Sequence, residues 1–173
     1  MGIVTEHPVI DGVLQRYSDA LGPEQQLYRN HVYRCFNYQR LLLGAQPPDT
    51  AALAWAIHDL GIWTAGTIDY LQPSADLAEQ LGSEFGIEDI ETVRTMVLGH
   101  HRLRRLIDPL IETFRLADRV DVSGGLLRDG VGRRDLRVIT TALPYRGFHP
   151  YLGWQIGRHA VRHPLRPLPM VRW

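Results

Sequence analysis

The sequence of 173 residues contains no lysine, so all 19 of its basic residues are arginines. Without a lysine amine, Schiff-base catalysis and the lysine-dependent phosphate loop of nucleotide-binding proteins are both excluded. The single cysteine, Cys35, also excludes an intrachain disulfide and a thiolate metal cluster. The sequence has neither a long uncharged apolar run nor a basic, apolar signal segment. We therefore expect a cytoplasmic protein that does not bind membranes.

Acidic residues are absent after Asp135. Residues 136–173 carry six arginines and no acid, which gives this segment a net charge of +6. Residues 1–135 carry 13 arginines and 19 acids, a net charge of −6, so the whole chain is neutral. A basic segment can bind nucleic acid or an anionic substrate, but this one lacks the dense basic runs of nucleic-acid-binding arms. We expect the basic, proline-rich tail at 145–173 to pack on the acidic body of the chain or on a second subunit of a homo-oligomer. A nucleic-acid partner is disfavoured.

Apolar residues recur with the 3.6-residue period of helices, and the sustained alternation of strands is missing. This pattern predicts an all-α protein with a single domain over residues 1–173, a bundle of seven or eight helices with an extended C-terminal tail. The expected helices span 9–20, 24–43, 49–60, 74–85, 88–102, 109–123, 133–143 and 152–163. Asp108 and Ser74 are expected N-caps, and Gly61 is expected to end the third helix.

Six polar residues are expected to point into the interior from the apolar faces or ends of these helices. They are His31 and Arg34 on the second helix, His58 and Asp59 at the end of the third, and Asp118 and Asp121 on the sixth. Any one of them could be an ordinary hydrogen-bonded core residue. Together, however, buried imidazoles and carboxylates are costly without a partner and form a common ligand set for divalent transition ions. Their convergence favours a metal site.

The fifth expected helix carries two adjacent histidines. His100 shares its helical face with the apolar residues Val93 and Met96, whereas the face of His101 includes Arg94. We therefore expect His100 to point inward and His101 to contribute less.

The order of His31 in "NHVYR", His58 and Asp59 in "HDLG", His100 in "VLGHH" and Asp118 in "LADRVD" resembles the HD-domain superfamily. Its members are all-helical, metal-dependent hydrolases, many of which act on phosphate esters of nucleotides. The similarity covers residues 25–125. It implies that His31, His58, Asp59 and Asp118 bind one divalent ion, which would be Mn, Fe, Co, Ni or Zn. The ion would activate water against a small-molecule substrate, expected to be anionic and phosphate-ester or nucleotide-like.

Three further residues are expected to act around this ion. His100 would relay a proton or meet developing charge at the rim of the site. Arg34 would clamp an anionic group of the substrate, and Asp121 would orient one of the metal ligands.

Two departures from the family pattern bear on the substrate and on the number of ions. Trp63 stands where many HD-domain phosphohydrolases have a lysine, and it either narrows the pocket or packs on the core. Residues 60–99 contain no histidine, although dinuclear members have one there, and Tyr70 lies near its place. These departures favour one ion and a small substrate. The alternatives are a hydratase similar to cyanamide hydratase, an HD-type di-iron oxygenase and a non-catalytic metal-binding protein.

Overall fold

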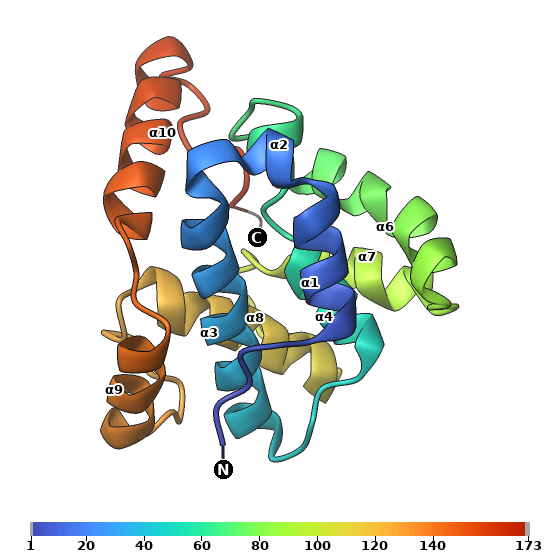
Figure 1. Cartoon of the computed structure of the whole chain (residues 1–173). Coiled ribbons are helices and arrows are strands. Elements are labelled where there is room, and N and C mark those ends of the chain that lie inside the picture. Colours follow the sequence, from blue (N-terminus) through green and yellow to red (C-terminus); the bar gives the residue numbers. More distant parts are fainter. Residues whose placement is uncertain (1, 172–173) are drawn as a thin grey trace.

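The computed structural model of the chain describes residues 2–171, and it is all-α, with no β-strand among those residues. The helices are α1 (Pro8–Arg16), α2 (Ser18–Leu21), α3 (Gln25–Leu43), α4 (Asp49–Ile57), α5 (Gly61–Thr64), α6 (Leu71–Phe85), α7 (Ile90–Gly99), α8 (Pro109–Val122), α9 (Arg133–Ala142) and α10 (Phe148–Arg162), with a short 3₁₀ turn at Gly22–Glu24 (Figure 1). Eight of these described helices have nine residues or more, as the sequence predicted. None of them is long and apolar enough to cross a membrane.

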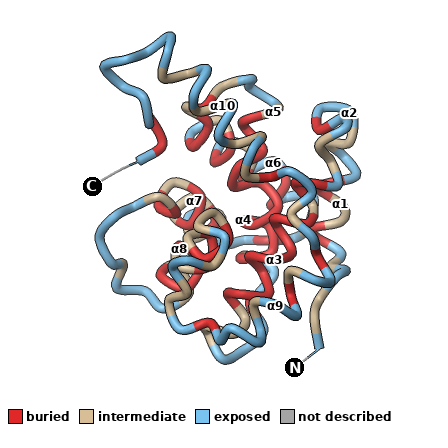
Figure 2. Tube along the Cα trace, turned by 90° about the vertical axis from the view of Figure 1, so that its left-hand side faces the viewer, coloured by how far each residue is buried: buried red, intermediate tan, exposed pale blue. Residues whose placement is uncertain are grey.

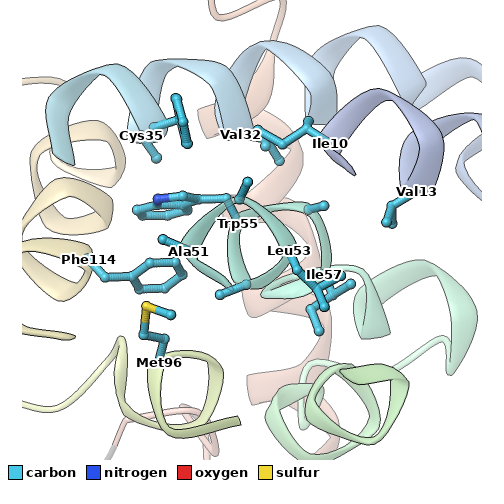
Figure 3. Packing of buried hydrophobic residues seen from close by; sticks show 14 of the residues in the cluster. Ile10, Val13, Val32, Cys35, Ala51, Leu53, Trp55, Ile57, Met96 and Phe114 are labelled. Carbon is cyan, nitrogen blue, oxygen red and sulfur yellow. The ribbon is translucent and has the colours of Figure 1, made fainter. Parts of the chain in front are cut away.

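Helix α4 forms the centre of the bundle. Residues 51–57 are all fully buried, and α1, α3, α6 and α7 pack around them. Trp55 of α4 stacks on Phe114 of α8 with ring centroids 3.7 Å apart (Figure 3). A helix that is apolar on every side belongs in a core. Because α4 is buried to its end, the next two residues, His58 and Asp59, also lie in the interior.

Some helix boundaries differ from those predicted. The helix expected at 9–20 is divided at Tyr17, and the one expected at 49–60 ends at Ile57. Gly61 does not end a helix but begins α5. Its lack of a side chain is required by packing, because a Cβ there would lie 2.7 Å from the carbonyl oxygen of Tyr70.

The N-cap predictions have different outcomes. Asp108 is confirmed, since its carboxylate accepts hydrogen bonds from the first two free N–H groups after Pro109. Ser74 is not an N-cap, because α6 begins three residues earlier, at Leu71, and accommodates Pro73 in its first turn. The buried hydroxyl of Ser74 instead accepts a hydrogen bond from the backbone N–H of Gly61 at 2.9 Å.

The C-terminal region is more helical than predicted and is mostly exposed (Figure 2). Helix α10 begins at Phe148 rather than at residue 152, and the described segment after Arg162 is not extended as predicted but folds into two turns, closed by the backbone hydrogen bonds Arg166 N–H to His163 O and Val171 N–H to Leu168 O. The structure describes this tail as far as residue 171. Met170 is buried in a small apolar cluster with Ile62 and other residues near α5, and Arg166 forms an ion pair with Asp69 at 3.6 Å. The tail therefore contacts the body of the chain, as expected.

Candidate metal centre

The four predicted metal ligands meet in the interior, where α3, α8 and the turn after α4 converge. Nε2 of His31 lies 3.0 Å from Nε2 of His58, 3.5 Å from an oxygen of Asp59 and 3.7 Å from an oxygen of Asp118. All four residues are buried. His31, His58 and Asp118 place their donor atoms close enough together to hold a metal ion.

Three imidazoles in this cluster are held in place through their Nδ1 atoms. Nδ1 of His58 and Nδ1 of His100 lie 2.8 and 2.7 Å from the carbonyl oxygen three residues earlier in the chain. Nδ1 of His31 lies 2.7 Å from a carboxylate oxygen of Asp121. Because a carbonyl oxygen only accepts, Nδ1 of His58 and His100 donates the proton, and in the neutral ring Nε2 keeps a lone pair. Histidines that bind metals are commonly oriented in this way.

Arg34 contacts Asp121 in the interior and is not among the residues that line the pocket at the cluster. Its Nε and Nη2 atoms contact the two carboxylate oxygens of Asp121 at 2.6 and 2.8 Å, and its Nη1 donates to the carbonyl oxygen of Leu143 at 3.1 Å. Both Arg34 and Asp121 are fully buried. The guanidinium group of Arg34 is therefore engaged by protein oxygens, and its role in clamping a substrate stays a prediction that these contacts do not favour. Asp121 contacts His31 as expected of a residue that orients a ligand.

His101 also reaches the cluster, which the sequence did not predict. Its Nδ1 lies 3.6 Å from an oxygen of Asp118, and its Nε2 lies 2.7 Å from the hydroxyl oxygen of Tyr70. The ring of His101 is 4.0 Å from that of His100. Since α7 ends at Gly99, the 100° separation of neighbouring helical residues does not apply to this pair. Gly99 is the sequence signal that could have indicated the early helix end.

The cluster contains three buried carboxylates, those of Asp59, Asp118 and Asp121. Burial raises the pKa of Asp118 to about 6, and the charge of Asp59 adds to the rise. Burial lowers the pKa of His58 to about 3, so this imidazole is neutral at pH 7. One oxygen each of Asp59 and Asp118, together with Nε2 of His100, has no hydrogen-bond partner. Buried, unpartnered carboxylate oxygens beside imidazole nitrogens fit a divalent metal ion.

His100 belongs to a second group of donors, which overlaps the first. With His58 and Asp59 it forms another set able to hold a metal ion, and its Nε2 lies 3.4 Å from Oδ1 of Asp59. Because His58 is common to both sets, the cluster offers ligands either for one ion or for two neighbouring ions.

A pocket of about 260 Å³ opens onto the cluster, and its opening is basic. Its lining includes His100, His101, Asp118, three arginines (Arg102, Arg115 and Arg119) and Val171 of the C-terminal tail. Arg115 and Arg119 are paired with Glu112 and Asp129, respectively. Arg102 is exposed and forms no ion pair within residues 2–171. It is thus the cation of this pocket that is free to meet an anion.

Trp63 is not among the residues that line this pocket. Its ring lies 4.9 Å from that of Tyr28 and is parallel to the ring of Tyr151 on α10, with centroids 5.6 Å apart. Of the two roles expected for Trp63, these contacts favour packing, since it joins α10 to the core.

No family model, curated protein or solved structure matches this chain.

Proposed function

We propose that this protein is a metal-dependent hydrolase of the HD type that acts on a small, anionic substrate such as a phosphate ester. The observation that carries the proposal is the convergence of His31, His58, Asp59 and Asp118 around buried oxygens that lack hydrogen-bond partners. These are the residues that the resemblance to the HD-domain superfamily implies as ligands.

His31, His58, Asp59 and Asp118 would hold the ion, which by its ligand set would be Mn, Fe, Co, Ni or Zn. When bound, a divalent ion of this kind supplies Lewis-acid activation of water and of the substrate's electrophilic centre. The chain itself supplies orientation. Asp121 fixes the ring of His31, and a backbone carbonyl fixes the ring of His58, so both Nε2 atoms are in place in advance.

His101 is suited to hold a proton at the pocket. Burial raises the pKa of Tyr70 well above its usual value, so the tyrosine hydroxyl stays protonated and donates to Nε2 of His101. Burial also lowers the pKa of His101, which is then neutral with its proton on Nδ1, the atom that faces Asp118. We therefore assign His101 the role of a neutral hydrogen-bond donor, whose Nδ1–H orients Asp118 at the pocket. His100, expected at the rim, is better placed as an additional ligand because its free Nε2 faces Asp59.

The basic opening of the pocket favours an anionic substrate. Arg102 lines the pocket beside His101 and Asp118 and forms no ion pair with a carboxylate of residues 2–171. A guanidinium group binds a phosphate oxygen pair through two parallel hydrogen bonds. Arg102 thus takes the substrate-binding role that the sequence had suggested for Arg34.

A dinuclear centre is the second candidate, favoured by the overlapping group of His58, Asp59 and His100. A metal content near two per chain together with a visible absorption band would favour a di-iron oxygenase. Turnover of nitrile-like compounds alone would favour a hydratase, and bound metal without any turnover would favour a non-catalytic role.

The proposal is tested by metal analysis of protein purified without added metal, followed by a screen of phosphate esters and nucleotides. Asp59→Ala should lose the metal and the activity, because it removes a charged ligand from the middle of the cluster. Asp19→Ala removes an exposed carboxylate in α2 and serves as the matched control. Full metal occupancy in Asp59→Ala would overturn the assignment.

A further inference from the structure

A second pocket, of about 270 Å³, lies between α10 and the loop that follows α5. Helix α10 and its C-terminal end contribute Arg158, His159, Arg162 and His163, and the loop contributes Gly66 and Thr67. None of its lining residues lines the pocket at the metal centre. The two pockets are therefore separate sites.

The α10 side of this pocket is cationic and has no counter-charge. Arg158 and Arg162 are one helical turn apart on the same face, and neither forms an ion pair within the described residues. No acidic residue lines the pocket, and none is available on α10 because the sequence has no acid after Asp135. The carboxylate of the adjoining loop, Asp69, is engaged by Arg166. Like charges one turn apart repel each other, so a bound anion would stabilise this arrangement.

The opposite wall of the pocket, at Gly66 and Thr67, offers a hydroxyl donor and a stretch of backbone that no side chain covers. The hydroxyl oxygen of Thr67 accepts a hydrogen bond from the N–H of Asp69 at 3.0 Å, so its own proton is free to be donated. Gly66 has a φ of 63°, and a Cβ at this position would meet nothing within 4 Å. A ligand can therefore approach the backbone at this turn closely.

The histidine pair of α10 does not make this a metal site. The rings of His159 and His163 lie 4.5 Å apart, but no carboxylate of the described residues lines the pocket, and two arginines would repel a cation. Nε2 of His159 also lies 3.2 Å from the carbonyl oxygen of Arg166, which takes up one of its two nitrogens. The charge of the lining thus selects an anion.

We propose that the pocket between α10 and residues 66–68 binds the phosphoryl group of a small molecule, independently of the metal centre. Guanidinium groups match phosphate oxygens in geometry, and two unpaired arginines neutralise the double negative charge of a phosphoryl group. The volume of the pocket is close to the lower end of the range for small-molecule sites, which suits inorganic phosphate or a small phosphate ester. The bound group would join α10 to the loop after α5.

Isothermal titration calorimetry with inorganic phosphate and with a nucleoside monophosphate tests this site. The protein is first treated with a chelator to remove metal, and the ionic strength is held constant with sodium chloride. Arg158→Gln/Arg162→Gln should weaken binding at least tenfold. Arg133→Gln/Arg134→Gln removes the same charge from two exposed arginines of α9 and should leave binding unchanged. Binding of both ligands with similar affinity identifies the phosphoryl group itself, whereas binding of the nucleotide alone would identify an ester as the ligand.

The metal-centre variant Asp59→Ala separates this site from the proposed hydrolase. It should bind phosphate as the wild type does, even though it retains no metal. If it fails to fold by circular dichroism, the chelator-treated wild type gives the same information. Binding that is unchanged in Arg158→Gln/Arg162→Gln, or that is lost in folded Asp59→Ala, would overturn the proposal. Absence of binding of both inorganic phosphate and the nucleoside monophosphate to the chelator-treated wild type would also overturn it.

Discussion

The metal centre and the pocket beside α10 both contain arginines, but their charges are compensated in different ways. Arg34 is fully buried, and both oxygens of Asp121 contact it. Arg158 and Arg162 are exposed and have no carboxylate partner among residues 2–171. A buried charge requires a partner within the protein, whereas water solvates an exposed one. Mutations in the first region should therefore lower the stability of the fold, and those in the second should lower ligand binding.

The largest effect on stability is expected when Asp121 is removed. Asp121→Ala leaves the buried guanidinium of Arg34 without a carboxylate and should lower the free energy of unfolding by about 3–5 kcal/mol. Arg158→Ala, at an exposed position, should change it by less than about 0.5 kcal/mol. Urea denaturation in the presence of a chelator measures both variants without a contribution from metal binding. Adding Arg34→Met to Asp121→Ala should restore part of the loss, and no recovery would contradict a buried-charge origin.

The two adjacent histidines provide the next test, within the metal centre. His101→Ala should leave the metal bound but lower kcat by about 10²-fold, because it removes the N–H donor that faces Asp118 at the pocket. His100→Ala should instead lower the metal content, since Nε2 of His100 faces Asp59. Metal analysis and steady-state kinetics on the same preparations distinguish the two roles. The reverse pattern would show that His100 acts on the substrate and His101 on the ion.

The same pair shows how far the sequence predicts the site. Periodicity correctly placed His31 and Arg34 inside because both lie within the long, regular α3. It failed for His101 because α7 ends at Gly99, and a helical projection has no meaning beyond the last turn. It also could not show that the partner of Arg34 is Asp121, since the two residues are 87 positions apart and meet only when α3 packs on α8.

A smaller effect is expected at the contact that joins α10 to the core. Trp63→Ala removes the parallel contact with Tyr151 and the contact with Tyr28, and should lower the free energy of unfolding by about 2 kcal/mol. Amide hydrogen exchange should increase in α10 more than in α3 or α4. Trp154→Ala is the matched control because Trp154 is 58% exposed. Equal exchange in α10 of both variants would contradict the anchoring role of Trp63.

The smallest effect concerns a buried charged pair, Glu112 and Arg115, at the edge of the metal pocket. Glu112 accepts hydrogen bonds from Arg115 and from the backbone N–H of Leu106, and Arg115 also donates to the carbonyl oxygen of Arg102. These contacts connect α8 to the segment that follows His100 and His101. Although burial opposes the charge of Glu112, the hydrogen bonds from Arg115 and Leu106 keep its pKa below the usual value.

Glu112→Gln should therefore lower the free energy of unfolding by about 1 kcal/mol at pH 7. Because the pKa of Glu112 is lower in the folded state, its charge stabilises the fold above the unfolded pKa of about 4.3, and this contribution is lost as the pH falls through the folded value. The difference in thermal stability between wild type and Glu112→Gln should accordingly shrink below about pH 4. Glu79→Gln, at an exposed position in α6, is the matched control and should show no such difference at pH 7. A difference for Glu112→Gln that stays constant down to pH 3 would mean that the shape of the side chain, and not its charge, holds this segment.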